Sequence, residues 1–178
     1  MKVNAEPAMV PELARSYSFT EIFREHARYL CRALLGLGVR PGDVDDVCQE
    51  VFLIVHRRLP EFDGRAVRSW LYAICLRVAS EYRRSARVRR EVSVAELPES
   101  KAPGGQLEAV FAGELGERLL TTLDRLDDDK REAFVLYEIE ELPLREVAEA
   151  LGCPLQTAYS RLQAARSVVR ADFTEREP

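Results

Sequence analysis

The segment from Leu126 to Arg170 places the tightest constraint on the fold, because its pattern predicts two short helices that cross at a sharp turn. Ala148 provides the small side chain that a close helix crossing needs, and Gly152 tolerates the positive φ of the turn between the helices. Pro154 suits the first position of the helix that follows. This pattern is typical of a helix-turn-helix, whose second helix enters the major groove of DNA.

The second helix of this motif is expected to present a polar face to solvent. Gln, Ser and Arg side chains on such a face can reach base edges or phosphates in a major groove. The alternative is an ordinary helical hairpin in a bundle, but the crossing residue, the turn residue and the polar face together favour DNA binding. The predicted DNA-binding residues here are Gln156, Thr157, Tyr159, Ser160, Arg161, Gln163 and Arg166.

Helical periodicity dominates the rest of the chain, and no alternating strand pattern of any length interrupts it. The sequence Ser18-Phe-Thr-Glu21 is a capping box that opens one helix, which the glycines at 36 and 38 end. Asp43 is expected to cap a second helix that Pro60 closes, and a third helix begins near Ser69 and runs to about Arg90. The expected fold class is therefore all-α.

A stretch rich in proline and glycine divides these helices into two groups. It contains Pro98, Pro103 and Gly104-Gly105, a composition typical of a flexible linker. We expect an N-terminal tail over residues 1–17, a helical domain over 18–90, a linker over 91–106, and a second helical domain with the helix-turn-helix over 107–178.

The net charge of −4 averages two regions of opposite sign. Residues 57–90 hold ten arginines against three acidic residues, whereas the chain from residue 126 onward holds seven basic against twelve acidic residues. Attraction to DNA depends on local charge, so the first of these regions is a candidate for binding a polyanion.

A glycine-containing loop and an arginine-rich helix make up that basic region. The arginines could hold phosphates, and the loop beside Trp70 could cradle an unstacked base. The simpler alternative is a solvated charged face. The predicted DNA-binding residues are Asp63, Gly64, Arg65, Arg68, Ser69, Trp70, Arg77, Arg83 and Arg84.

An acidic and polar run, Asp45-Asp-Val-Cys-Gln-Glu-Val-Phe52, lies beside an apolar stripe. Helix capping and solvation explain it, and so does a docking surface for a basic or polar partner helix. Physical arguments alone leave both interpretations open.

Other residue patterns exclude several classes of function. The four cysteines form no C-x-x-C pair, and the two histidines are not placed to complete a zinc site, so reduced and mostly buried thiols without metal or cofactor are expected. No catalytic triad, phosphate-binding loop or paired-carboxylate arrangement is present, so an enzyme is not expected. The sequence lacks an apolar run long enough to span a bilayer and a signal peptide, which predicts a cytoplasmic protein without membrane insertion.

Taken together, these motifs resemble the extracytoplasmic-function (ECF) sigma factors, the minimal two-domain class of the sigma-70 family. The run from Asp45 to Phe52 resembles the helix that binds core RNA polymerase. The segments from Phe62 to Arg65 and from Ser69 to Ile74 resemble the loop and helix that open and read the minus-ten element, and Leu126 to Arg166 resembles the minus-thirty-five reader. The resemblance implies these core-binding residues: Asp45, Asp46, Gln49, Glu50 and Phe52.

The resemblance also implies partners, namely bacterial RNA polymerase core, promoter DNA and an anti-sigma factor. The sequence departs from the family at Arg77, where asparagine is common, and at Tyr159, where lysine is usual. A stand-alone helix-turn-helix regulator is the alternative, but it would leave the Asp45–Phe52 run and the arginine-rich helix without a role. The acidic second region further suggests weak DNA binding by the free chain.

Overall fold

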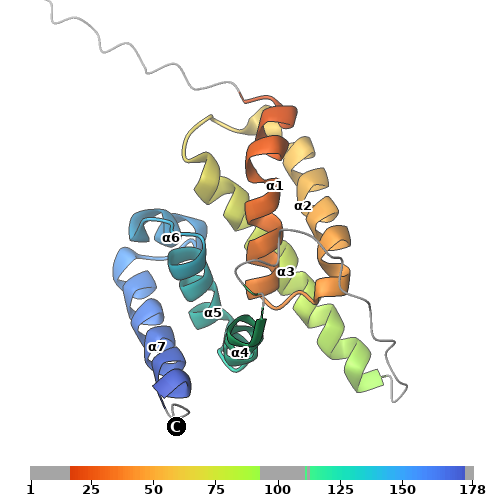
Figure 1. The fold of residues 1–178 in the computed structure, drawn as a ribbon. Helices are drawn as coiled ribbons and strands as arrows, with labels where there is room; N and C mark the ends of the chain where they lie inside the picture. The colour runs from red at the N-terminus through yellow and green to blue at the C-terminus, as the bar shows by residue number, and fades with distance from the viewer. Residues whose placement is uncertain (1–16, 93–110, 112, 175–178) are drawn as a thin grey trace, which may run out of the picture.

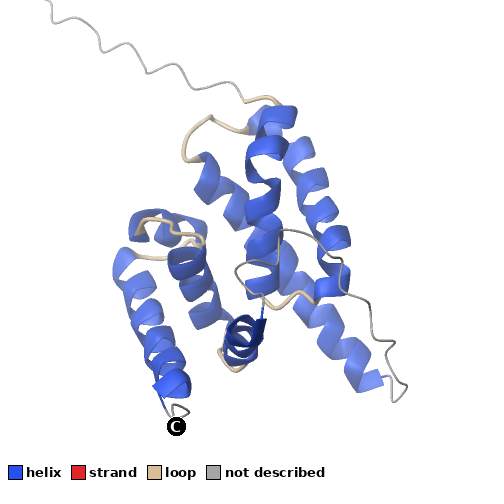
Figure 2. Cartoon of the chain, viewed as in Figure 1, coloured by secondary structure: helices blue, strands red, loops and turns tan. Residues whose placement is uncertain are grey.

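The computed structural model describes residues 17–92, 111 and 113–174. All regular elements in this part of the chain are helical, which confirms the all-α prediction (Figures 1 and 2). The first unit consists of α1 (Phe19–Gly36), α2 (Val44–Arg58) and α3 (Val67–Val92), with 3₁₀ turns at Pro41–Asp43 and Leu59–Glu61. The second unit consists of α4 (Gly113–Asp124), α5 (Asp128–Phe134), the π-turn η4 (Val135–Ile139), α6 (Leu144–Ala150) and α7 (Leu155–Thr174).

The start of α1 has the predicted capping box. The Ser18 hydroxyl accepts a hydrogen bond from the Glu21 amide at 3.2 Å, and the Glu21 carboxylate accepts one from the Ser18 amide at 2.9 Å. These reciprocal bonds satisfy two backbone donors at the helix start. At the other end, Gly38 has φ of 89°, a conformation that L side chains rarely adopt.

Asp43 lies at the predicted N-cap position of α2, but it does not cap the helix through its side chain. Its side chain makes no capping hydrogen bond to α2, and Pro41–Asp43 form a 3₁₀ turn instead. The Asp43 carboxylate accepts a hydrogen bond from the Tyr82 hydroxyl of α3. The Asp43 carboxylate, which the local sequence pattern assigned to the start of α2, is therefore bound by Tyr82, a residue that is distant in the sequence.

The second unit contains the helix-turn-helix at the expected place. Asp127 caps α5 by accepting from the Lys130 amide at 2.9 Å, and Gly152 has φ of 60° at the turn between α6 and α7. Val147, Ala158 and Leu162 are buried where these two helices cross. The crossing and turn inferred from the sequence are thus observed.

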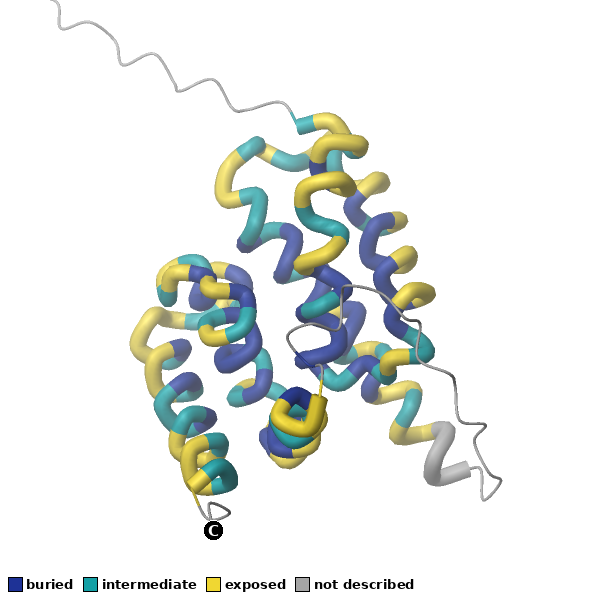
Figure 3. The backbone as a smooth tube through the Cα atoms, viewed as in Figure 1, coloured by how far each residue is buried: buried dark blue, intermediate teal, exposed yellow. Residues whose placement is uncertain are grey.

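The two units pack against each other along α3 and α1. Helix α6 contacts α3, and the π-turn η4 contacts α1. Gly36 lies so close to Val135 that an added Cβ would be 3.1 Å from the valine side chain. Buried positions of both units line this junction and belong to one continuous apolar cluster (Figure 3).

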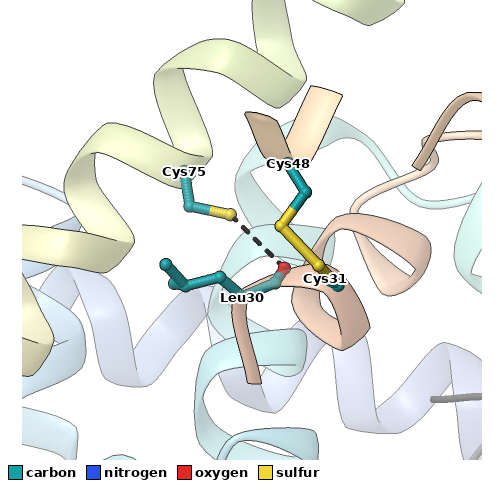
Figure 4. Close-up of a disulfide and its surroundings, with 4 residues drawn as sticks. All are labelled: Leu30, Cys31, Cys48 and Cys75. Carbon is teal, nitrogen blue, oxygen red and sulfur yellow. Dashed lines mark hydrogen bonds between the residues drawn. A yellow bond between two sulfur atoms is a disulfide. The ribbon is translucent and has the colours of Figure 1, made fainter. Parts of the chain in front are cut away.

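The prediction that the cysteines are reduced thiols is wrong for Cys31 and Cys48. They form a disulfide between α1 and α2 (Figure 4). Cys75 and Cys153 are free. The two helices pack with the cysteine Cα atoms 5.7 Å apart, although 17 positions separate them in the sequence. This proximity is a product of tertiary packing, which spacing rules do not reveal.

Candidate nucleic-acid and polymerase interfaces

The acidic and polar face of α2 is exposed to solvent. Asp45, Asp46, Gln49 and Glu50 face solvent, but Phe52 is only 4% exposed. Its ring packs edge-on against Phe23, with the ring centroids 4.8 Å apart. Phe52 therefore supports this face from the core of the first unit.

Leu53 extends the same face and was missed by the sequence reasoning. It is 58% exposed and follows Gln49 and Glu50 at helical spacing. An exposed leucine within a polar surface offers an apolar contact to a partner. The i, i+4 relation to Gln49 could have identified it from the sequence.

The loop between α2 and α3 has a defined local structure. The Asp63 carboxylate accepts a hydrogen bond from the Arg65 amide at 2.9 Å, which is an Asx turn. Gly64 has φ of 80°, and Ala66 has φ of 44°, which is unusual for a residue with a Cβ atom. The Trp70 ring stacks on Phe62, with centroids 4.4 Å apart. The loop thus presents Asp63 and Arg65 to solvent above a stacked aromatic pair.

The predicted arginine face of α3 divides into exposed and buried members. Arg77 and Arg84 are exposed, and Arg77 forms an ion pair with Glu81 at 3.2 Å. The sequence predicts that Arg83 binds DNA together with Arg77 and Arg84, but Arg83 is only 6% exposed and does not share their exposed face. Its guanidinium donates to the Leu37 carbonyl at 2.6 Å and pairs with Glu132 of the second unit at 3.2 Å.

Two further predicted DNA-binding residues of the first unit face the second unit. Arg68 donates a hydrogen bond to the Glu140 carbonyl at 2.8 Å. Ser69 is buried, and its hydroxyl lies 3.5 Å from the Glu149 carboxylate of α6. In this arrangement Arg68, Ser69 and Arg83 all contact polar groups of the second unit.

The recognition helix α7 exposes three of the seven predicted residues fully. Gln156, Tyr159 and Ser160 are exposed, whereas Thr157 and Gln163 are half-buried. Arg161 pairs with Asp129 at 2.6 Å, and Arg166 pairs with Glu138 at 2.5 Å. The hydrogen bond that Arg166 donates to the Glu138 carboxylate raises the pKa of Arg166 above its usual value. Both arginines are therefore held by acidic side chains of the second unit.

Within the described residues, no group of three or more His, Cys, Asp or Glu side chains is arranged to hold a metal ion. The same part of the chain contains no helix of the length and apolarity that a bilayer crossing requires.

Comparison with known proteins identifies the family. Residues 22–89 match the family described as Sigma-70 region 2, and residues 116–168 match Sigma-70, region 4. The chain is 31% identical to the RNA polymerase sigma factor NccH of Alcaligenes xylosoxydans xylosoxydans, and the alignment covers 93% of this chain and 95% of NccH. The chain belongs to the sigma-70 family. Sigma factors are transcription initiation factors, so this protein is not an enzyme.

Further relatives place this sigma factor in the ECF class. It is 31% identical to the ECF RNA polymerase sigma-E factor of Escherichia coli, and 77% of each chain is covered. Among solved structures, CnrH in complex with the cytosolic domain of CnrY has a TM-score of 0.68 at 27% identity, covering 89% of both chains. The sigma factor RpoE of Bartonella quintana, solved with the anti-sigma factor NepR, has a TM-score of 0.65 at 20% identity, which shows a shared fold. All predicted polymerase-binding and DNA-binding residues lie inside the two matched ranges.

Proposed function

We propose that this sigma factor binds core RNA polymerase and directs promoter-specific initiation through two DNA contacts, one from each unit. The observation that carries the proposal is the presence of region 2 and region 4 on one chain, in that order. The polymerase supplies the chemistry, and the sigma factor supplies binding energy and sequence selectivity.

Helix α2 is the proposed docking element for core polymerase. Asp45, Asp46, Gln49 and Glu50 form an exposed polar surface that suits a basic or polar partner helix. Leu53 adds an apolar contact on the same face. Phe52 supports this surface without being exposed on it, because its ring packs with Phe23 and fixes the position of α2 on α1.

The loop from Phe62 to Ala66 and the start of α3 are the proposed minus-ten reader. Opening a few base pairs costs a few kcal/mol, and capture of an unstacked base by an aromatic residue or loop can offset part of this cost. We assign this capture to Trp70, Asp63 and Arg65, and we assign the binding of the strand's backbone to Arg77 and Arg84; the exposure of Asp63, Arg65, Arg77 and Arg84 supports these assignments.

Helix α7 is the proposed minus-thirty-five reader. Gln156, Tyr159 and Ser160 project from its exposed face, close to the turn at Gly152. Arg161 and Arg166 are paired with Asp129 and Glu138, so DNA phosphates must replace these carboxylates to bind the same guanidinium groups. Because these ion pairs must be broken first, α7 alone should bind DNA weakly. It should contribute to promoter binding when polymerase holds it next to the promoter.

We also assign an anti-sigma partner and a cytoplasmic location to this protein. Both solved structures named above are complexes: CnrH is bound to the cytosolic domain of CnrY, and RpoE is bound to the anti-sigma factor NepR. A subunit of bacterial RNA polymerase acts where the chromosome is, which is the cytoplasm.

Reconstituted transcription tests the proposal. Core polymerase mixed with this protein and a promoter library should initiate at a defined subset of promoters. Arg161→Ala and Arg166→Ala should each weaken promoter binding by the holoenzyme while core association is unchanged, and Arg170→Ala, one turn further along α7, is the matched control. Failure of the wild-type protein to associate with core at micromolar concentration would refute the proposed function.

A further inference from the structure

We propose that the free protein is closed on itself, with the second unit covering part of the minus-ten reader, and that the buried carboxylate of Glu140 holds it closed. This inference rests on the proposed function, because it concerns access to the same DNA-binding face. Its basis is a set of polar contacts between residues that are far apart in the sequence.

Glu140 lies at the end of the π-turn η4, and its side chain is fully buried against the first unit. One carboxylate oxygen accepts from Arg32 Nε at 2.8 Å. The other accepts from Arg32 Nη2 at 2.8 Å and from the Tyr72 hydroxyl at 2.7 Å. The backbone carbonyl of Glu140 accepts from Arg68 at 2.8 Å. We call these four residues, Arg32, Arg68, Tyr72 and Glu140, the Glu140 cluster.

The chemistry of the Glu140 cluster makes closure specific. A buried carboxylate is costly unless it is paired and hydrogen-bonded, and both conditions are met only when α1 and α3 are in place. Burial and the neighbouring Glu140 carboxylate raise the pKa of Tyr72, so its hydroxyl stays protonated and donates. Glu140 therefore fits one arrangement of the two units, in which a bidentate arginine meets it across the junction.

A second set of contacts joins the second unit to α3 nearer the C-terminal end of that helix. Arg83 pairs with Asp128 at 3.1 Å and with Glu132 at 3.2 Å, and Arg87 lies 3.8 Å from Asp128. Arg68 and Arg83 are about 22 Å apart along a regular helix. Contacts at two such separated points fix both the position and the rotation of the second unit on α3.

Closure competes with DNA because the same groups are used. Arg68 donates to the Glu140 carbonyl and Arg83 donates to the Glu132 carboxylate, and these bonds occupy donors that phosphate oxygens would otherwise take. Ser69 is buried beneath α6. The measured DNA affinity of such a protein is its open-state affinity multiplied by the open fraction. The acidic residues of the second unit thus act as internal competitors for promoter DNA.

Two glutamates next to each other provide a matched test. Glu140→Gln and Glu141→Gln remove the same charge from adjacent positions, but only Glu140 is buried in the cluster, whereas Glu141 is exposed. Small-angle X-ray scattering of each free protein reports closure through the radius of gyration. Fluorescence anisotropy with a labelled single-stranded 25-mer of mixed sequence reports access to the DNA-binding face.

We expect Glu140→Gln to increase the radius of gyration and to bind the oligonucleotide about tenfold more tightly, the change expected when charge-assisted hydrogen bonds are weakened. Glu141→Gln should match the wild type in both measurements. Equal scattering and equal DNA affinity for the two variants would overturn the proposal, and so would expansion of Glu140→Gln without a gain in affinity.

Two further measurements keep the test decisive. Far-UV circular dichroism checks that each variant is folded, and Tyr72→Phe, which removes a single hydroxyl from the cluster, should also expand the protein. If Glu140→Gln does not fold, an unchanged radius for Tyr72→Phe overturns the proposal. Neither scattering nor anisotropy requires polymerase, so a failure to bind core would refute the proposed function and leave the closure result to stand by itself.

Discussion

Arg131 is a buried cation that serves as a cap for α4, and its replacement should lower the stability of the second unit. It is 4% exposed, and its Nε donates to the Leu123 carbonyl at 2.8 Å. Its Nη2 donates to the Leu126 carbonyl at a longer 3.4 Å. The Leu123 carbonyl lies in the last turn of α4, where it also accepts from the Leu126 amide at 3.1 Å, and the Leu126 carbonyl lies two residues beyond the end of the helix. Carbonyls at a helix end lack the amide donors of a following turn, so side-chain donors such as Arg131 complete their hydrogen bonding. Arg131→Met keeps much of the apolar stem and removes the donors.

The magnitude follows from these contacts. The short hydrogen bond from a charged donor contributes about 1.5–3 kcal/mol, and the long one about 1 kcal/mol. Burial lowers the pKa of Arg131, so removing the charge recovers part of its desolvation cost, about 1 kcal/mol. The expected net loss is about 1.5–3 kcal/mol in the free energy of unfolding, or about 3–12 °C in Tm for a chain of this size.

Lys130→Met is the matched control, because it removes the adjacent cation from the helix surface, where Lys130 pairs with Asp127 at 2.6 Å. This exposed pair contributes about 0.5 kcal/mol. Urea and thermal unfolding followed by far-UV circular dichroism measure both variants. If Arg131→Met and Lys130→Met shift the transition equally, the capping role assigned to Arg131 is refuted.

Three further predictions concern single local features. Gly152→Ala should cost about 1 kcal/mol in unfolding free energy, because the φ of 60° disfavours a Cβ atom even though no atom lies within 4 Å of its position. Gly152→Asn should cost less, since asparagine tolerates this conformation better. Equal urea midpoints for the wild type and both variants would contradict this prediction. Asp127→Ala should cost about 1 kcal/mol through loss of the α5 cap, whereas Asp127→Asn should retain the cap. The hydrogen bond from Lys130 lowers the pKa of Asp127. The stabilisation by the Asp127 charge is therefore present above the unfolded-state pKa and is lost as the pH falls through the folded-state pKa. A pH series of urea midpoints should show this loss in the wild type and not in Asp127→Asn. The Cys31–Cys48 disulfide should add about 3 kcal/mol, so a reductant should lower the Tm of the wild type but leave that of Cys48→Ala unchanged.

Local features of this fold could be predicted from the sequence because their causes are local. The capping box at Ser18, the cap at Asp127 and the positive φ at Gly152 each depend on residues within one helical turn. The family resemblance rested on such segments in the right order, so it too could be recognised before the structure.

Features that depend on packing between distant helices could not be predicted in this way. Arg83 and Arg84 are neighbours in an arginine-rich helix, but Arg83 follows Ala79 by four residues and lies on the buried stripe of α3. Charge suggested an exposed position, and the carboxylates that allow its burial lie about 45 residues later, on α5. The Cys31–Cys48 pairing and the contacts of Glu140 likewise depend on tertiary packing.

The direction of the Glu140 side chain depends on the number of residues in the π-turn η4. The Glu140 amide bonds to the Val135 carbonyl, five residues earlier, at 3.0 Å, so η4 holds one residue more per turn than an α-helix would. Each residue of an α-helix rotates the following side chain by about 100°. Deleting one residue from Val135–Ile139 would therefore turn the carboxylate away from Arg32 while leaving the composition of the helix almost unchanged. In evolution, a single-codon insertion or deletion at this turn could add or remove self-closure without altering any residue that is proposed to contact DNA.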